Sequence, residues 1–379
     1  MIKVVELIKD KEIHGWWNWK YRACPAERFL LNPYAGCSVG CFFCYSRALP
    51  GYHREAFLKD LVFVWVNFAE GLSRRLDKLY ISPPGYLSPT SDPFQPVNLK
   101  YRIAEKVIRA FIERNLPILV VTKREISEEA LSLLEKQRDS VFEVSLLALN
   151  EKLRRFLSPG GSTVKEILSS LEKASKRGIH TVLRLDPILP FINDKEDDIY
   201  ALLKEAKERG VRHVVVSCLD IPLRIKRTVL SFLSRWDSSL PFKYDSLYKE
   251  RVSNSIQASL TYRKELFSKV REIADSLSLT LSLCMEFTED GKNLNEIYAT
   301  SKNCEGKVMP ISLRQGEKFL PLPCFNEGSC LTCFKPTCGV SALAMRGETK
   351  YLSYNDFRRM KVGERVGSLF GSCNFVDGN

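Results

Sequence analysis

The sequence predicts an α/β protein whose parallel strands form a partial barrel, followed by a cysteine-rich extension. Three observations predict this fold. Between residues 28 and 220, short β-branched runs alternate with amphipathic helical patterns. The helical stretches 163–178 and 195–210 both end in glycine after a basic turn, which is a usual helix stop before a strand. From about residue 285 the periodicity fades, and Cys, Gly, Asn and Pro become frequent.

The alternating segments are repeated strand–helix units. Such repeats imply parallel strands joined by right-handed crossovers, so we expect a partial (β/α)6 TIM-like barrel. No glycine-rich dinucleotide fingerprint follows the first strand, which disfavours a doubly wound nucleotide fold. Residues 221–278 have mainly helical patterns, and 279–287 predict one more strand. The six expected strands read RFLLNPY (28–34), KLYISPP (78–84), PILVVTKR (117–124), SVFEVSLLAL (140–149), GIHTVLRLDPILP (178–190) and RHVVVSCLD (212–220).

Three parts of the chain follow from these patterns. We expect an N-terminal strap at 1–27, a core barrel with appended helices at 28–284, and a metal-binding extension at 285–379. The extension has too little apolar periodicity to bury a core of its own. A bound metal would supply the missing folding energy.

Charge and composition restrict the class of protein. The 57 basic and 45 acidic residues give a net charge of +12, which favours a polyanionic partner such as nucleic acid. The longest apolar run, LVFVWV, is too short to cross a bilayer, and the charged N-terminus lacks a signal-peptide core. We therefore expect a cytoplasmic protein with no membrane partner. In that reducing compartment the 12 cysteines are better explained as metal ligands than as disulfides.

The first cysteine group is Cys37, Cys41 and Cys44, directly after the first predicted strand. In a barrel of parallel strands the reactive end is the carboxyl edge, where this loop lies. Three thiolates in a Cys-x3-Cys-x2-Cys loop can bind three irons of a [4Fe–4S] cluster and leave the fourth iron open for a ligand. A structural zinc site would normally have a fourth protein ligand nearby.

The motif and the segments after it resemble the radical S-adenosylmethionine (SAM) superfamily, and within it the spore photoproduct lyase-like subfamily. The resemblance covers about residues 28–220. It is carried by the cysteine loop and, in order along the chain, by SPTSDPFQP, VVTKR, EVSLLALN, LSPGGST and RLDPILP. It implies an enzyme that reductively cleaves SAM to methionine and a 5′-deoxyadenosyl radical, which abstracts hydrogen from a substrate. It also implies a reductant such as ferredoxin or flavodoxin.

The resemblance assigns roles position by position. Cys37, Cys41 and Cys44 would hold the cluster, whose open iron would bind the methionyl amino and carboxylate groups of SAM. The remaining matched residues are the expected SAM contacts Ser91, Lys123 and Ser145, the candidate adenosyl contact Arg154, and Tyr45 as an aromatic residue near the active site.

One position departs from the lyase pattern. The lyase has a cysteine two residues before the matched serine, and it returns a hydrogen atom to the product. Here that position is Pro89, which cannot do so. Cys218, at the end of the sixth strand, is a candidate replacement if it points into the barrel. The alternative is a buried cysteine that packs as a small hydrophobic residue.

The second cysteine group comprises Cys324, Cys330, Cys333 and Cys338, a complete set of four thiols. Zinc, a single iron or an auxiliary [4Fe–4S] cluster would each fit such a set. Cys284 or Cys304 are possible substitutes for one of the four.

Two further features have both structural and functional interpretations. Trp16, Trp17 and Trp19 lie beside Lys20 and Arg22, so they either stack bases or cover the barrel. Arg184 and Asp186, at the end of the fifth strand, are either active-site groups or a structural ion pair.

Three functions are consistent with these patterns. The first is a radical SAM enzyme acting on nucleic acid, in repair or modification. The second is radical SAM modification of a protein or peptide with the help of an auxiliary cluster. The third is a zinc-stapled nucleic-acid-binding protein without redox chemistry. The sequence leaves the substrate and the oligomeric state open.

Overall fold

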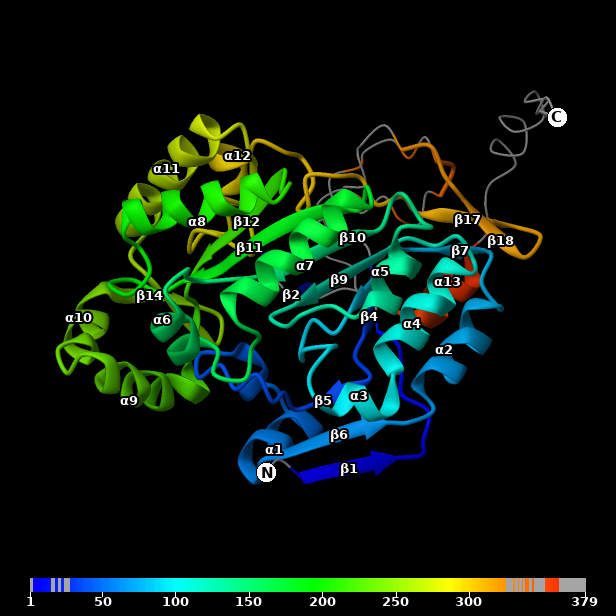
Figure 1. Cartoon of the computed structure of the whole chain (residues 1–379), viewed down its shortest axis with the longest axis horizontal. Coiled ribbons are helices and arrows are strands. Elements are labelled where there is room, and N and C mark those ends of the chain that lie inside the picture. Colours follow the sequence, from blue (N-terminus) through cyan, green and yellow to red (C-terminus); the bar gives the residue numbers. More distant parts are fainter. Residues whose placement is uncertain are drawn as a thin grey trace.

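The computed structural model describes residues 3–14, 18–19, 22–23, 28–324, 330, 333, 336, 338–340, 343 and 352–360. Its centre is a seven-stranded sheet in the order β16-β12-β11-β10-β9-β8-β4 (Figure 1). All neighbouring strands in it are parallel and follow chain order, which confirms the predicted partial barrel. The strands are β4 (Phe29–Leu31), β8 (Gly85–Leu87), β9 (Ile118–Thr122), β10 (Val141–Ser145), β11 (His180–Ile188), β12 (His213–Cys218) and β16 (Thr280–Leu283).

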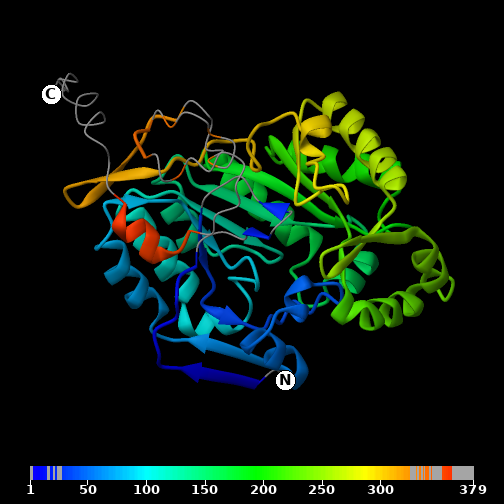
Figure 2. The ribbon, with the colours of Figure 1, turned by 180° about the vertical axis from the view of Figure 1, so that it is seen from behind.

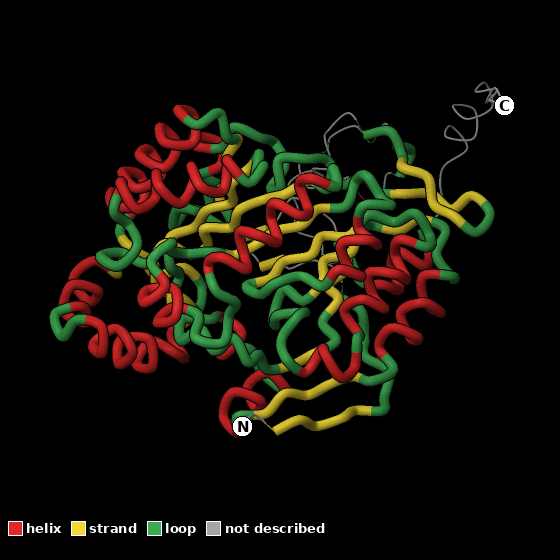
Figure 3. Tube along the Cα trace, viewed as in Figure 1, coloured by secondary structure: helices red, strands yellow, loops and turns green. Residues whose placement is uncertain are grey.

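Helices connect these strands and lie together across one face of the sheet (Figure 3). Helices α7 and α8 end just before the glycines that the sequence predicted as helix stops. A capping box joins Thr163 and Glu166 at the start of α7, and Gly178 and Gly210 follow α7 and α8 with φ of +73° and +90°. The connecting helices are α3 (Val97–Tyr101), α4 (Ile103–Ile112), α5 (Glu128–Leu134), α6 (Glu151–Leu157), α7 (Val164–Lys176), α8 (Glu196–Glu208) and α11 (Leu260–Ser276).

The two faces of the sheet have separate cores. Alternate side chains of each strand pack under the helices, as Phe142 and Val216 do. The other face, which we call the inner face, carries Leu30, Tyr86, Leu119, Val141, Val182 and Val215. Both faces are buried, which explains the almost continuous apolar runs in the strand sequences.

Residues 303–311 cover the inner face near the amino ends of the strands. Met309 packs there with the apolar side chains. The Glu305 carbonyl lies 2.7 Å from His180 Nε2, and Arg28 forms a buried ion pair with the Glu305 carboxylate. The Cys304 carbonyl lies 2.9 Å from His213 Nε2. Because residues 303–311 cover the amino ends of the strands, a ligand-binding site is expected at their carboxyl ends.

A smaller sheet stands beside the barrel. In it β1 (Lys3–Leu7) is parallel to β6 (Leu61–Trp65), and β5 (Tyr34–Ala35) is antiparallel to β6. Figure 2 shows it from behind, at the edge of the molecule that also carries the N-terminus. The turn η1 (Tyr45–Ala48) and the helices α1 (Tyr52–Lys59) and α2 (Phe68–Leu76) complete this region. The sequence showed β6 only as a short apolar run.

Two sequence predictions were incomplete. Residues 78–84 contain only β7 (Ile81–Ser82), which pairs with β17 (Ser312–Gln315) outside the barrel. The barrel strand β8 begins only after Pro83 and Pro84, because proline has no N–H to donate to a sheet. The 221–278 segment contains α9 (Lys226–Trp236) and α10 (Leu240–Leu247), but also β13 (Ile221–Pro222), β14 (Tyr248–Val252) and β15 (Ser255–Ala258).

The remaining elements are short, and they are β2 (Asn18–Trp19), β3 (Arg22–Ala23), η2 (Leu223–Ile225), α12 (Asn295–Tyr298), β18 (Lys318–Pro321) and α13 (Tyr354–Arg359). Trp16, Trp17, Cys24 and Cys373 lie outside the described residues. Among the described residues, no helix has the length and apolarity that a membrane span requires.

A first prediction concerns His213, which is fully buried and bonded to Thr280 and Ser282. Burial lowers its pKa to about 4, below the ordinary value of 6.5. The folded state therefore binds fewer protons than the unfolded state between pH 6.5 and 4. The free energy of unfolding consequently decreases as the pH is lowered from 6.5 to 4. The full loss is about 3 kcal/mol. Thermal unfolding at pH 7 and pH 5 should differ less in His213→Gln than in the parent. The exposed His14→Gln is the control, and an unchanged difference in His213→Gln would refute the assignment.

Candidate cofactor site at the strand ends

The three cysteines of the first group lie in one loop after β4 and β5, which we call the Cys loop (36–44). Cys41 is buried, whereas Cys37 and Cys44 are half-buried. Arg47 Nε donates to the Cys41 carbonyl at 2.9 Å, and the Cys41 sulfur lies 3.3 Å from Ser158 Oγ. The loop is thus fixed from both sides at the carboxyl edge of the sheet.

Burial controls the protonation of these thiols. It raises the pKa of Cys37, and the nearby Asp92 carboxylate raises that pKa further. Burial also raises the pKa of Cys41, although the neighbouring Lys123 ammonium lowers it. Thiols in such surroundings stay neutral unless a cation binds them, because a buried thiolate needs a compensating charge.

The turn after β8 ties the Cys loop to the next strand. Asp92 is buried and accepts hydrogen bonds from Thr122 Oγ1 at 2.9 Å and from the Lys123 backbone N–H at 2.7 Å. Gln95 is fully buried and accepts from the Ser38 N–H at 3.0 Å. Sequence reasoning missed both supports, although Asp92 directly follows Ser91 in the quoted SPTSDPFQP segment.

The structure brings two of the predicted SAM contacts together. Lys123, just after β9, donates from Nζ to Ser145 Oγ at the end of β10. Ser91 lies in the turn after β8, and its buried hydroxyl has no hydrogen-bond partner among the described residues. The hydroxyl of Ser88, in the same turn, is also buried, and no group in the described part of the chain bonds it. Hydroxyls of this kind are unusual in a protein interior and fit a ligand that would bind them.

Arg154 has a supporting position. Its Nε donates to Glu151 Oε1 at 2.8 Å, and its Nη1 donates to the carbonyls of Ser158 at 2.9 Å and Gly161 at 3.1 Å. It therefore holds the loop that contacts Cys41. It also lines a small pocket with Lys123, Ser145, Leu146, Leu147, Leu157, Ser158, Ser162 and Ile167. Three of the predicted residues thus share one cavity.

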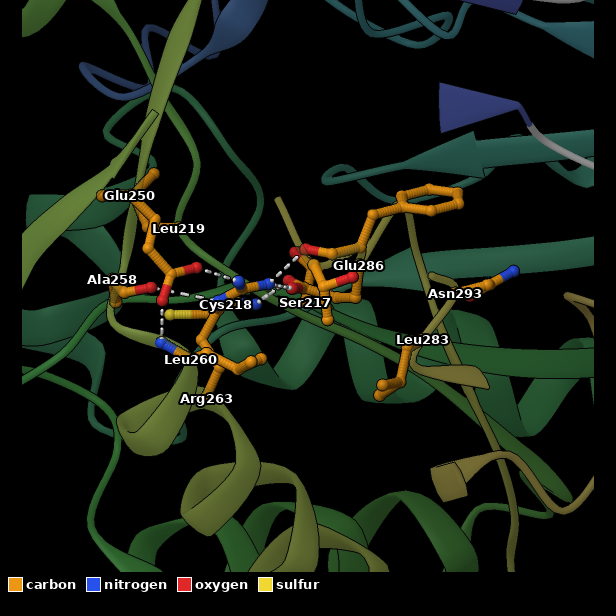
Figure 4. Close-up of polar contacts among 12 residues, drawn as sticks. Ser217, Cys218, Leu219, Glu250, Ala258, Leu260, Arg263, Leu283, Glu286 and Asn293 are labelled. Carbon is orange, nitrogen blue, oxygen red and sulfur yellow. Dashed lines mark hydrogen bonds and ion pairs between the residues drawn. The ribbon is translucent and has the colours of Figure 1, made fainter. Parts of the chain in front are cut away.

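Tyr45 and Cys218 lie in different surroundings. Tyr45 is 45% exposed, and its hydroxyl donates to the Pro89 carbonyl at 2.5 Å. Tyr45 therefore lies beside the position where this sequence differs from the lyase pattern. Cys218 is buried in the helix-side core rather than among the inner-face residues. Its N–H donates to Glu286 Oε1 at 2.7 Å (Figure 4). The premise that Cys218 points into the barrel was therefore wrong, because it alternates with the inward Ser217 along β12.

A buried charge network lies behind Cys218. The guanidinium of Arg263 bonds Glu286 at 2.9 Å and Glu250 at 2.6 Å, as Figure 4 shows. Burial raises the pKa of Glu286 to about 7, while Arg263 opposes that shift. The network joins α11, β14 and the end of β16, so it positions the far edge of the sheet.

Arg184 and Asp186 form an ion pair on the inner face, with Nη1 and Oδ2 2.6 Å apart. Arg184 also bonds the fully buried Glu143 at 2.8 Å, and Ser217 donates to Asp186. One oxygen of Glu143 is buried and has no hydrogen-bond partner within the residues that the structure describes. The ion pair predicted as one alternative is therefore present, and these contacts are compatible with both a structural and an active-site role.

The second cysteine group is partly described. Among the groups that raise the pKa of Cys338 are the neighbouring Cys324 and Cys333, after burial as the main cause. Cys284 instead lies near Arg184, Asp186 and Cys304. No set of three or more His, Cys, Asp or Glu side chains placed to hold a metal ion is found within the described part of the chain.

The residues at the first site fit an iron–sulfur cluster and SAM in their chemistry. The loop supplies three thiols, the donor type that such clusters use. Lys123 supplies a cation suited to a carboxylate, and the unpartnered hydroxyls of Ser88 and Ser91 supply hydrogen-bonding groups.

Comparisons with known proteins agree with this arrangement. Residues 31–203 match the model of the radical SAM superfamily. A radical SAM Nα-GlyT isomerase of Pseudomonas phage M6 is 26% identical over 94% of this chain and 78% of that protein. An uncharacterized protein of Methanocaldococcus jannaschii is 20% identical over 45% of this chain and 64% of that protein.

Solved structures share the fold. A spore photoproduct lyase mutant with bound AdoMet and dinucleoside spore photoproduct has a TM-score of 0.57 at 18% identity, covering 71% of this chain and 79% of that chain. The lyase complexed with dinucleoside spore photoproduct gives 0.56 at 14% identity, covering 74% and 82%. The superfamily implies a [4Fe–4S] cluster, SAM and a source of electrons. Residues 31–203 therefore match the radical SAM superfamily, and the phage relative that aligns with most of the chain is named a radical SAM isomerase.

Proposed function

We propose that Cys37, Cys41 and Cys44 hold the [4Fe–4S] cluster, and that the 5′-deoxyadenosyl radical made there abstracts hydrogen from a nucleic acid or nucleoside substrate. The observation that carries this proposal is the convergence of the Cys loop with Lys123, Ser145 and the unpartnered Ser91 hydroxyl at one strand edge. When bound, the cluster supplies the electron that breaks the C5′–S bond of SAM.

The chain's own residues prepare that reaction. Lys123 would pair with the methionyl carboxylate, and Ser91 and Ser145 would donate or accept hydrogen bonds at the same ligand. Asp92 and Gln95 hold the two loops in register, and Arg154 fixes the loop at 158–161. The cover at 303–311 closes one end of the inner face, which would limit access of water to a reactive radical.

Three facts support a nucleic-acid class of substrate. The net charge is +12. Spore photoproduct lyase structures of the same fold hold dinucleoside spore photoproduct, and the phage relative is named an Nα-GlyT isomerase. Pro89 stands where the lyase has its hydrogen-returning cysteine, so we infer a reaction other than that of the lyase.

A second candidate is modification of a protein or peptide with an auxiliary cluster. The proximity of Cys338 to Cys324 and Cys333 favours it. Iron and sulfide analysis of anaerobically purified protein separates the possibilities. About four irons per chain indicate one cluster, and about eight indicate two.

The substrate class is tested by turnover. Reduced, reconstituted protein is incubated with SAM and with DNA, RNA or cell peptides, and 5′-deoxyadenosine is measured. Stimulation by DNA or RNA is expected. If peptides alone stimulate 5′-deoxyadenosine formation and the protein holds about eight irons, the substrate is a protein or peptide and not a nucleic acid. Colourless protein with zinc at both cysteine groups would refute both.

Lys123 gives a separate prediction. Lys123→Met keeps an unbranched side chain of similar shape, one atom shorter, but removes the cation beside Cys41 and Ser145. We expect SAM affinity to fall about tenfold to a hundredfold, since a charge-assisted bond contributes roughly 1.5–3 kcal/mol. Equilibrium dialysis with labelled SAM on cluster-loaded protein measures it. The exposed Lys204→Met is the control, and equal affinity in the two variants would contradict the assignment.

A further inference from the structure

Aromatic side chains join the Cys loop to the protein surface. Phe42 of the loop is 1% exposed and stacks on Phe232 of α9, with ring centroids 5.3 Å apart and planes 2° apart. Phe42 also packs at 5.3 Å on Phe156 of α6, and Phe156 lies 4.8 Å from Trp236. Trp236 is 37% exposed. Ring contacts therefore lead without interruption from the thiol loop to solvent.

The surface at the end of this path is positively charged. Arg227 and Arg235 are exposed on α9, which contains no acidic residue. The cations also lie over the rings, with Lys152 Nζ 5.8 Å from Trp236 and Arg235 Cζ 4.2 Å from Phe232. Helices α6 and α9 adjoin in Figure 1. We name this surface the α6–α9 patch, and it consists of Lys152, Arg155, Arg224, Arg227, Arg235 and Trp236.

The patch is anchored to the Cys loop by more than the rings. Arg224, in the η2 turn before α9, donates from Nη1 to the Ala48 carbonyl at 2.8 Å. Ala48 ends the η1 turn that follows Cys44 directly. The patch is therefore a surface adjoining the thiol loop, reached through both backbone and ring contacts.

We propose that the α6–α9 patch docks the reductant, a small acidic electron-transfer protein of the ferredoxin or flavodoxin class. This inference rests on the proposed function, because the electron acceptor is the cluster of the Cys loop. Electron-transfer partners use small, transient interfaces, and opposite charge steers their encounter. The aromatic path gives the electron a short, packed route, and electron-transfer rates fall steeply with distance.

The electron balance is simple. The reductant is oxidised by one electron, which enters through the patch and the Cys loop. As the C5′–S bond of SAM breaks, one bonding electron stays on C5′, and the other pairs with the delivered electron on the methionine sulfur. No proton moves in this step.

A nucleic acid is the competing occupant of a basic, aromatic surface. Base-stacking surfaces present ring faces to successive bases. Here Phe156 and Phe232 both pack on the buried Phe42 and lead inward. Their arrangement favours an electron path over a base-stacking platform.

The test uses the cluster-loaded full chain with two electron sources. Arg227→Glu/Arg235→Glu is compared with Lys264→Glu/Lys269→Glu, which changes the net charge equally on exposed positions of α11. With reduced flavodoxin as the probe, we expect the patch variant to need about tenfold more flavodoxin for half-maximal 5′-deoxyadenosine formation. With dithionite, both variants should match the parent. The affinity for oxidised flavodoxin, measured at low and high salt, should fall in the patch variant alone.

The other outcomes are decisive. An unchanged flavodoxin requirement overturns the proposal, and so does an equal loss with both electron sources. Loss of binding to a DNA oligonucleotide with retained flavodoxin binding assigns the patch to nucleic acid instead. If the charge reversal impairs folding, Arg227→Gln/Arg235→Gln replaces it under the same criteria. If the parent protein does not cleave SAM with dithionite, the proposed function is refuted. If it cleaves SAM but the patch variant needs no more flavodoxin, only the docking proposal is refuted.

Discussion

Replacing Cys41 by Ala is expected to reduce 5′-deoxyadenosine formation to the level of a protein-free control. Cys41 is the buried member of the Cys loop, bonded to Ser158 and close to Lys123. A cluster that loses one of three thiolates is not held in the geometry that leaves a single open iron. Iron content, the visible absorption of the cluster and SAM cleavage should all fall together, and Cys37→Ala and Cys44→Ala should behave alike.

The matched control is Cys218→Ala. Cys218 is as buried as Cys41, but it lies in the helix-side core. This variant should lose at most about 1–3 kcal/mol of stability and keep its iron at the first site. Retained cleavage in Cys41→Ala, or equal loss of iron in Cys218→Ala, would show that the cluster lies elsewhere.

Gly160→Ala is expected to have the second largest effect. A Cβ at this position would overlap the Ser38 carbonyl oxygen and lie 3.1 Å from the Val39 Cα, both backbone atoms. The Gly160 N–H also donates to the Val39 carbonyl at 2.8 Å. The Cys loop must therefore move, because backbone cannot rotate away as a side chain does. We expect about 1–3 kcal/mol of lost stability and a larger fractional loss of cluster incorporation.

The two losses are separated by measuring thermal unfolding and iron content on the same preparation. Gly71→Ala in α2 is the control, because its Cβ would meet the ends of two flexible side chains, Asp10 Oδ1 at 3.1 Å and Arg74 Nη2 at 3.9 Å. That variant should be neutral or slightly stabilised, since alanine favours helix. Normal cluster content in Gly160→Ala would contradict the view that this contact sets the Cys loop.

The sequence predicted the repeated part of the fold well. Helices α7 and α8 and strands β9 to β12 carry local signals, namely capping residues, terminal glycines and β-branched runs. The smaller β1-β6-β5 sheet was missed, because its pairing joins residues 3–7 to 61–65 and no local pattern reveals such a contact. The β14–β15 hairpin was missed because the polar residues of β14, KER at 249–251, resemble an exposed helix face.

In the candidate site, too, local motifs could be predicted from the sequence, whereas long-range contacts could not. The Cys loop could be named from its motif, and Lys123 and Ser145 from the family resemblance; the structure brings Lys123 and Ser145 into contact. Asp92, Gln95 and Gly160 could not, because each acts through a contact with a distant segment. The sequence left two alternatives for Cys218, and the structure agrees with the buried, packing one. Sequence alone could not choose, since a shift of one residue along a strand moves a side chain to the other face of the sheet.

The central claim is that the Cys loop holds a cluster with one iron open to SAM. The most direct measurement is electron paramagnetic resonance of the reduced, reconstituted protein before and after SAM is added, with 5′-deoxyadenosine measured in the same sample. The account predicts a reduced-cluster signal that changes when SAM binds and is followed by 5′-deoxyadenosine. A cluster signal that SAM leaves unchanged, with no 5′-deoxyadenosine under strong reductant, would contradict it.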